Sequence, residues 1–268
     1  MGNELVKLID TTLCTACRGC QVACKQWNEL PGLPTKQIGT YQNPPDLQWN
    51  TWTLMRFQEH RDANGKFQWI FRKDGCMHCT DASCVKVCPS GALYYTDIKT
   101  VGVHRDKCIG CKECISACPF DIPRYDKETE KVYKCDLCYS RIQENLPPAC
   151  VKSCITGALT IGLKDEMIKK AYAKVEKLGG DANVYGDKFV GGTHVIYVLQ
   201  FKPEVYDELP LDPKVPTSIA LWKNLLKPLS LLAAGGVVGG SLLHYFTHGP
   251  HKPHPEHYDQ DNKKQGGA

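Results

Sequence analysis

The apolar residues along the chain predict short strands, one amphipathic helix and one long apolar segment. From Lys164 to Leu178 they recur at spacings of three and four, as in a helix with one buried face. The pair Gly179-Gly180 predicts the end of that helix. Residues 193–201 are rich in β-branched and aromatic side chains, and they predict a strand.

Shorter segments predict further strands. The aromatic-rich runs 52–58 and 66–72 flank residues 62–65, which contain Asn-Gly, so they predict a β-hairpin with a longer connection. Residues 92–95 and 158–161 each follow a glycine and predict short strands after a turn. Together these elements indicate an α+β fold.

The C-terminal part has a different composition. Residues 229–246 carry no formal charge, and their length is close to the roughly 20 apolar residues that a membrane-spanning helix needs. Counting back to residue 219, with two lysines reaching the interface, predicts a transmembrane helix over 219–246. A linker over 202–218 and a polar tail over 247–268 flank it.

Two overlapping GxxxG pairs lie in this apolar segment, formed by Gly235 with Gly239 and by Gly236 with Gly240. Small residues at this spacing let membrane helices approach closely, so we expect a docking face for a membrane subunit. The alternative is that glycine is simply frequent in such helices.

Composition narrows the class of protein. The chain has 268 residues, 16 of them cysteine, and is long enough to bury a core without disulfides. Its first ten residues contain no apolar signal-peptide region, so we expect the cysteines to bind metal. A formal net charge of +4 is too small to indicate a nucleic-acid-binding protein.

The cysteines form four groups of four, and each group opens with Cys-x2-Cys and closes with Cys-x3-Cys. The middle gaps differ, so the pattern is an internal repeat with a variable centre. The groups are Cys14, Cys17, Cys20, Cys24; Cys76, Cys79, Cys84, Cys88; Cys108, Cys111, Cys114, Cys118; and Cys135, Cys138, Cys150, Cys154.

The spacing in the first and third groups is that of bacterial ferredoxin [4Fe–4S] clusters. Pro89 and Pro119 follow the second and third groups, as they do in that motif. Zinc is the alternative, but three cysteines within seven residues are too crowded for one tetrahedral site. No serine, histidine and aspartate set or nucleotide-binding motif is evident, so we expect electron transfer rather than catalysis in this chain.

In two-cluster ferredoxins the last cysteine of each run binds the other cluster. Pairing the second group with the third, and the first with the fourth, predicts four [4Fe–4S] clusters, A to D. The predicted sets are Cys76, Cys79, Cys84 and Cys118 for A; Cys108, Cys111, Cys114 and Cys88 for B; Cys14, Cys17, Cys20 and Cys154 for C; and Cys135, Cys138, Cys150 and Cys24 for D.

This pairing divides the chain into two ferredoxin-like lobes. Residues 1–75 and 125–201 are expected to form the lobe with sets C and D, the inserted hairpin and a helix and strand extension. Residues 76–124 are expected to form the lobe with sets A and B. His78 and Arg124 lie beside predicted clusters, where they either tune reduction potential or cap loops.

From about residue 6 to residue 246 the sequence resembles the iron–sulfur β subunit of membrane-bound respiratory formate dehydrogenase. Residues 14–24, 72–79, 118–124, 132–135 and 191–195 carry the resemblance, together with the single apolar C-terminal segment. The cysteine pattern alone is also similar to the β subunits of dimethyl sulfoxide and polysulfide reductases and of some membrane-bound hydrogenases. These remain the alternatives, beside a zinc-binding scaffold.

The resemblance implies a set of partners. These are a catalytic α subunit with a molybdenum or tungsten bis-pterin cofactor and a γ subunit that is a membrane cytochrome b passing electrons to quinone. It further implies a trimer of such heterotrimers. It also implies export together with the α subunit, which would place the globular part in the periplasm, anchored by the C-terminal helix.

Overall fold

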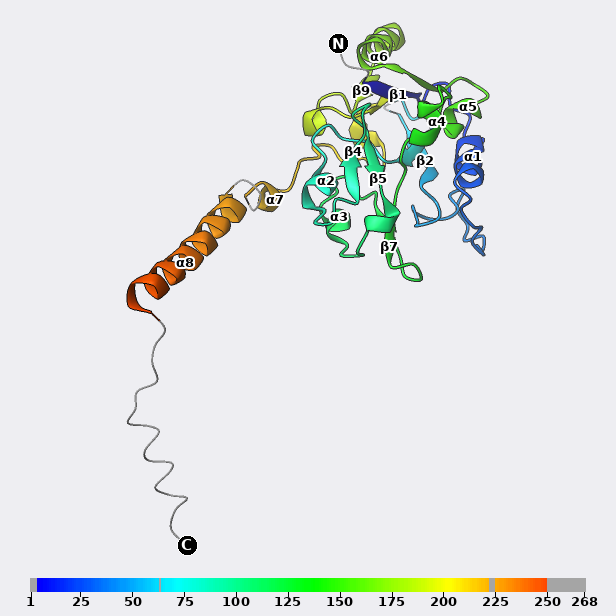
Figure 1. Ribbon diagram of the computed structural model, residues 1–268. Coiled ribbons are helices and arrows are strands. Elements are labelled where there is room, and N and C mark those ends of the chain that lie inside the picture. Colours follow the sequence, from blue (N-terminus) through cyan, green and yellow to red (C-terminus); the bar gives the residue numbers. More distant parts are fainter. Residues whose placement is uncertain (1–3, 63, 222–224, 250–268) are drawn as a thin grey trace, which may run out of the picture. The chain divides into compact units, whose positions relative to one another are not determined.

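The computed structural model describes residues 4–62, 64–221 and 225–249 (Figure 1). The chain divides into two units, residues up to Ile219 and residues from Ala220. The first unit contains a four-stranded sheet with the strand order β8-β1-β10-β9. Its first strand, β1, lies beside its last strand, β10, so the sheet joins the two ends of the unit. These strands are β1 (Leu5–Asp10), β8 (Leu159–Leu163), β9 (Asn183–Tyr185) and β10 (Val195–Leu199). β1 pairs in parallel with β10, whereas the β1–β8 and β10–β9 pairs are antiparallel.

Helix α6 (Lys164–Leu178) covers one face of this sheet. Its fully buried Ala171 packs with Val6 and Leu8 of β1 and with Ile196 of β10. The helix has the predicted bounds and ends at Gly179, whose φ of 64° few other residues adopt easily.

The alternation of side chains along each strand sends the neighbouring residues to the opposite face. There Ile9 of β1 and Tyr197 of β10 pack into a second core, which also contains Cys20 and Cys150. One face of the sheet is therefore covered by a helix, and the other faces cysteines.

Three hairpins complete the first unit. In the largest, β2 (Thr53–Arg61) pairs with β3 (Phe67–Gly75) in continuous antiparallel register, so the two aromatic runs do pair, in longer strands than expected. The other two join β4 (Leu93–Tyr95) to β5 (Val101–Val103) and β6 (Arg124–Asp126) to β7 (Lys131–Tyr133).

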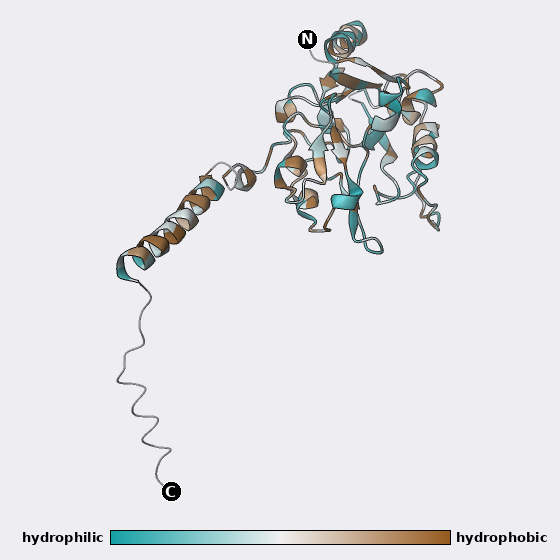
Figure 2. Cartoon of the chain, viewed as in Figure 1, coloured by the Kyte–Doolittle hydropathy of each residue, from teal (hydrophilic) through white to brown (hydrophobic). Residues whose placement is uncertain are grey.

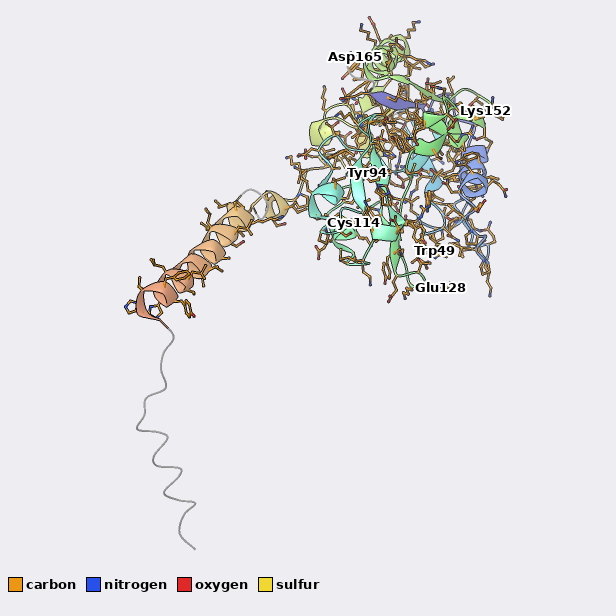
Figure 3. All side chains as sticks on the ribbon, viewed as in Figure 1. Trp49, Tyr94, Cys114, Glu128, Lys152 and Asp165 are labelled. Carbon is orange, nitrogen blue, oxygen red and sulfur yellow. The ribbon has the colours of Figure 1, made fainter. Side chains whose placement is uncertain are left out.

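Short helices contain or adjoin cysteines of each group. α1 packs on α5 and α2 on α3, so the first group lies against the fourth and the second against the third. The short helices are α1 (Gly19–Trp27), α2 (Ser83–Val87), α3 (Glu113–Ser116), α4 (Tyr139–Gln143) and α5 (Ala149–Lys152), with 3-10 turns η1 (Arg105–Lys107), η2 (Phe189–Gly191) and η3 (Pro203–Val205). Side chains fill the space among these elements (Figure 3).

The C-terminal unit contains α8 (Lys227–His248), an apolar helix long enough to cross a membrane (Figure 2). The predicted span of 219–246 overlaps α8 and α7 (Thr217–Leu221), and Pro228 is the second residue of α8. Residues 222–224, between the two helices, lie outside the described residues, so the start of the span stays a prediction. Most of the predicted tail, 250–268, lies outside the described residues.

Candidate metal centres

All four cysteine groups share one backbone feature. The second residue after the first cysteine has a left-handed conformation in each group, with φ of 56° at Ala16, 50° at His78, 68° at Gly110 and 62° at Leu137. Only one of these residues is glycine. The other three adopt this conformation at a cost in backbone strain. Such strain persists where the surroundings demand it, as in a loop that must turn several thiols toward one centre.

Two of the predicted cysteine sets each line a small pocket. Set C (Cys14, Cys17, Cys20 and Cys154) lines one, and set B (Cys88, Cys108, Cys111 and Cys114) lines another. Each set therefore combines three cysteines of one group with the last cysteine of another group.

The other two sets are recognisable from the electrostatic influence of their thiols on one another. Burial raises the pKa of Cys79, and the next largest causes are Cys76, Cys118 and Cys84, which are the rest of set A.

Set D shows the same relationship. Burial raises the pKa of Cys24, and the negative charges of Cys135, Cys150 and Cys138 add to that effect, while Lys73 opposes it. The structure therefore places the cysteines of each predicted set near one another, and their binding of clusters stays a prediction.

These sets fit an iron–sulfur cluster in their donor chemistry. Soft thiolates are the ligands that such clusters use. Burial and neighbouring cysteines raise the pKa of Cys20 to about 11 and that of Cys114 to about 12, so the thiolates need a positive metal core beside them to ionise at neutral pH.

Within the described residues, no three side chains of His, Cys, Asp or Glu converge closely enough to hold a single metal ion.

Backbone N–H groups also point at two of the sulfurs. The N–H of Ala16 donates to Cys14 Sγ and the N–H of Leu137 to Cys135 Sγ, both at 3.4 Å. Both donors are residues with the left-handed conformation described above. Hydrogen bonds of this kind to cluster ligands influence the reduction potential.

Three lysines outside the cysteine motifs are buried beside the cysteines. Lys7, Lys73 and Lys134 are 1%, 3% and 2% exposed. Lysine is almost never fully buried unless it is paired. The signal available in the sequence was position, because Lys73 and Lys134 lie three residues and one residue before the first cysteine of a group.

The two other residues singled out beside the clusters differ in role. Arg124 donates to Asp46 Oδ2 at 2.7 Å and to the carbonyl of Leu47 at 3.0 Å, so it ties two loops together. His78 is fully buried, and its Nδ1 accepts a hydrogen bond from the N–H of Val101 at 3.2 Å. Burial lowers the pKa of His78 and favours its neutral form.

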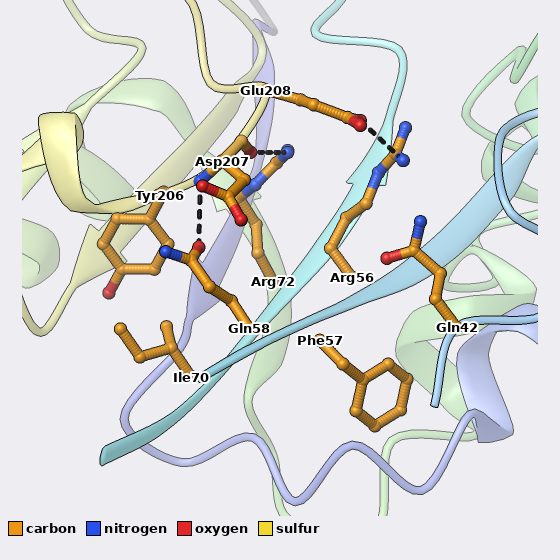
Figure 4. Close-up of a pocket in the computed structure, with 9 residues that line it drawn as sticks. All are labelled: Gln42, Arg56, Phe57, Gln58, Ile70, Arg72, Tyr206, Asp207 and Glu208. Atoms are coloured by element: carbon orange, nitrogen blue, oxygen red, sulfur yellow. Dashed lines mark hydrogen bonds and ion pairs between the residues drawn. The ribbon is translucent and has the colours of Figure 1, made fainter. Parts of the chain in front are cut away.

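A pocket between β2, β3 and residues 206–208 is lined by no cysteine (Figure 4). Its charged groups pair within the protein, since Arg56 contacts Glu208 at 2.6 Å and Arg72 donates to the carbonyl of Asp207 at 3.2 Å.

Comparisons with protein families agree with the cysteine pattern and with the apolar helix. Families described as "4Fe-4S dicluster domain" match residues 67–164 and 13–92. A family described as "Formate dehydrogenase N, transmembrane" matches residues 215–257, a range that includes α8. The chain therefore contains tandem 4Fe–4S domains and a C-terminal membrane helix.

The fold and its thiol sets define a class of protein, the multi-cluster ferredoxin-like proteins that transfer single electrons. The nitrate-inducible formate dehydrogenase iron–sulfur subunit of Escherichia coli is 47% identical, covering 93% of this chain and 87% of that protein. The formate dehydrogenase iron–sulfur subunit of Haemophilus influenzae is 42% identical, covering 98% and 88%. The protein belongs to the family of formate dehydrogenase iron–sulfur subunits.

A relative with a different reaction is less similar. A component of the anaerobic dimethyl sulfoxide reductase of E. coli is 37% identical over 63% of this sequence and 78% of its own. The relatives are thus named as parts of different oxidoreductases.

Proposed function

We propose that this chain carries four [4Fe–4S] clusters, held by sets A to D, and transfers electrons for a formate-oxidising complex. The observation that carries the proposal is the gathering of the cysteines, because each set combines residues from two groups as ferredoxin pairing requires. Each bound cluster would accept and release one electron at a time.

The sets follow one another through the unit in the order C, D, A, B. Neighbouring sets share hydrophobic surroundings. After burial, a thiol of the next set is among the causes that raise a cysteine's pKa. Cys150 of D acts in this way on Cys20 of C, Cys76 of A on Cys135 of D, and Cys114 of B on Cys84 of A.

The two ends of this series reach the surface. Cys17 in set C and Cys111 in set B are exposed, whereas the cysteines of sets D and A are buried or half-buried. Exposed ends suit exchange of electrons with two different partners, one at each end.

The lobes proposed from the sequence, 1–75 with 125–201 and 76–124, agree with the packing of α1 on α5 and of α2 on α3. The β2–β3 hairpin belongs to the first lobe, where Met55 of β2 packs in the same core as Cys20. We retain this division as part of the proposal.

The partners follow from family membership. We assign to the complex a catalytic subunit with a molybdenum or tungsten bis-pterin cofactor, and a membrane cytochrome b that passes electrons to quinone. The complex would be a trimer of these three-subunit units. Relatives named formate dehydrogenase subunits and the matching transmembrane family support this assignment.

Helix α8 would anchor the chain in the membrane, with the globular part in the periplasm after export with the catalytic subunit. The length and apolar character of α8 and the family match over 215–257 support the anchor. The side of the membrane rests on the resemblance, because lysines flank the helix about equally on both sides.

The second candidate is the same electron-transfer role in a dimethyl sulfoxide reductase-type complex or a membrane-bound hydrogenase. The 37% identical relative favours the first of these.

The test is formate-dependent reduction of a viologen dye by the complex that co-purifies with this chain from native membranes, together with iron and sulfide analysis. We expect activity to follow the chain through each column and about 16 iron and 16 sulfide per chain. If an intact complex reduces the dye with hydrogen but not with formate, the electron donor is hydrogen and the assignment to formate oxidation is wrong. About 12 iron per chain would contradict the fourth cluster.

A further inference from the structure

Lys73 lies where sets C and D meet. It is on β3 and only 3% exposed, its Nζ donates to Thr53 Oγ1 at 2.8 Å, and its side chain lines the cavity of set C. Burial alone would lower the pKa of Lys73, but the thiolates of Cys150, Cys20 and Cys135 reverse this and raise it. Two of those thiolates belong to set D and one to set C.

Lys134 occupies the corresponding place between sets D and A. It follows β7, is 2% exposed, and its Nζ donates to the carbonyl of Val101 at 2.7 Å and to that of Cys135 at 2.9 Å. Burial lowers the pKa of Lys134, whereas the thiolates of Cys76, Cys84 and Cys135 raise it and prevail.

Neither ammonium group has a carboxylate partner. Among the residues that the structure describes, neither Lys73 nor Lys134 forms an ion pair. The lysines that do are Lys86, Lys164, Lys174, Lys202 and Lys214. A buried ammonium held only by neutral oxygens is costly unless negative charge lies nearby. The thiolate sets on either side provide that negative charge, and at Lys134 the carboxylate of Asp136 adds a smaller contribution.

We propose that the ammonium groups of Lys73 and Lys134 are fixed positive charges that raise the reduction potentials of the clusters in the adjoining sets. Each one-electron reduction adds one negative charge to a cluster, and a buried cation stabilises that charge strongly because the surroundings are poorly polarisable. Lys73 acts on C and D, and Lys134 acts on D and A. The lysines themselves gain and lose no proton.

The inference rests on the cluster assignment proposed above and adds positioning residues to it. Cluster B serves as an internal control, because neither lysine lines set B. Its exposed ligand Cys111 gives a way to recognise its signal, since Cys111→Ser alters the spectrum of that cluster alone.

The test is a redox titration of the intact complex followed by electron paramagnetic resonance, in which each cluster gives its own midpoint. Lys73→Met keeps the length of the side chain and removes its charge. We expect the equilibrium constant for reduction to fall about tenfold for C and D, which corresponds to ~59 mV for one electron. Lys134→Met should lower the midpoint potentials of clusters D and A in the same way. Cluster B should keep its midpoint potential in both variants.

The matched control is Lys86→Met. Lys86 lies in α2, between two cysteines in sequence, but its side chain is 30% exposed and pairs with Asp81, so solvent screens its charge. We expect wild-type midpoints for all four clusters in this variant. A shift equal to that of Lys73→Met would overturn the assignment of the effect to buried charge.

Assembly is followed by iron analysis. Unchanged midpoints in Lys73→Met and Lys134→Met at full iron content would overturn the inference. Loss of iron in both Lys73→Met and Lys73→Arg would also overturn it, because it indicates that the side chain has a packing role. Loss of iron in Lys73→Met with normal iron and midpoints in Lys73→Arg would support the need for charge. A wild-type complex without four signals would instead contradict the proposed function.

Discussion

Gly110 and Gly91 form a matched pair that tests how set B is built. Both have φ of +68°, a conformation that glycine adopts without strain. A Cβ at Gly110 would lie 2.4 Å from the carbonyl oxygen of Glu130, whereas a Cβ at Gly91 would meet nothing within 4 Å. The two alanine variants therefore share a backbone cost and differ only in the clash.

The left-handed conformation costs an alanine roughly 1–2 kcal/mol, so this is the whole expected effect of Gly91→Ala. Gly110→Ala adds a clash with backbone in the β6–β7 turn, and relieving such a contact costs about 1–3 kcal/mol more. Because Gly110 lies between Cys108 and Cys111, the displaced segment is the one that holds two ligands of set B.

The assay is iron content of the purified complex, with paramagnetic resonance of the reduced clusters. Unfolding of a protein with several bound clusters is not two-state, so cluster retention reports the effect more directly than a melting curve. We expect about 16 iron per chain in Gly91→Ala, and about 12, with the signal of cluster B missing, in Gly110→Ala. Equal iron content in the two variants would refute this reasoning.

Three further outcomes are expected. Leucine in place of both Gly235 and Gly239 should fill the small-residue face of α8 and loosen the membrane subunit, whereas unchanged co-purification would count against that docking face. Asp74→Ala removes a carboxylate 3.0 Å from the buried guanidinium of Arg72 and should cost about 3–5 kcal/mol, seen as a lower unfolding midpoint. Burial holds the pKa of His194 below its usual value of about 6.5, so stability present above that pH should be lost as the pH falls below it. His194→Gln should flatten this dependence in thermal unfolding between about pH 5 and pH 8.

The elements predicted most accurately are those that depend on neighbours in the chain. The bounds of α6 follow from a periodic apolar face and a glycine at its end, and both are local. The apolar segment of α8 is recognisable for the same reason. Its predicted start at residue 219 stays a prediction, because residues 222–224 between α7 and α8 lie outside the described residues.

The sequence alone also predicted which cysteines gather into sets, because ligand spacing is a property of the chain and ferredoxin pairing supplies the exchange of the last cysteine. It gave no sign that Ala16, His78 and Leu137 adopt a left-handed conformation, since only Gly110 at that position is a residue with such a preference. The loop must turn to gather its thiols, and that demand comes from the site as a whole.

Only the tertiary structure decided the order of the sets and the burial of Lys73 and Lys134. A lysine in a sequence is ordinarily read as a surface residue, and the position of these two shortly before a cysteine group is only a weak local sign against it. Their burial depends on β1 lying between β8 and β10, and on hairpins packed against the cysteine loops, which are contacts between distant parts of the chain. Spacing along the chain predicts which thiols share a cluster, whereas packing in three dimensions determines which charges surround them.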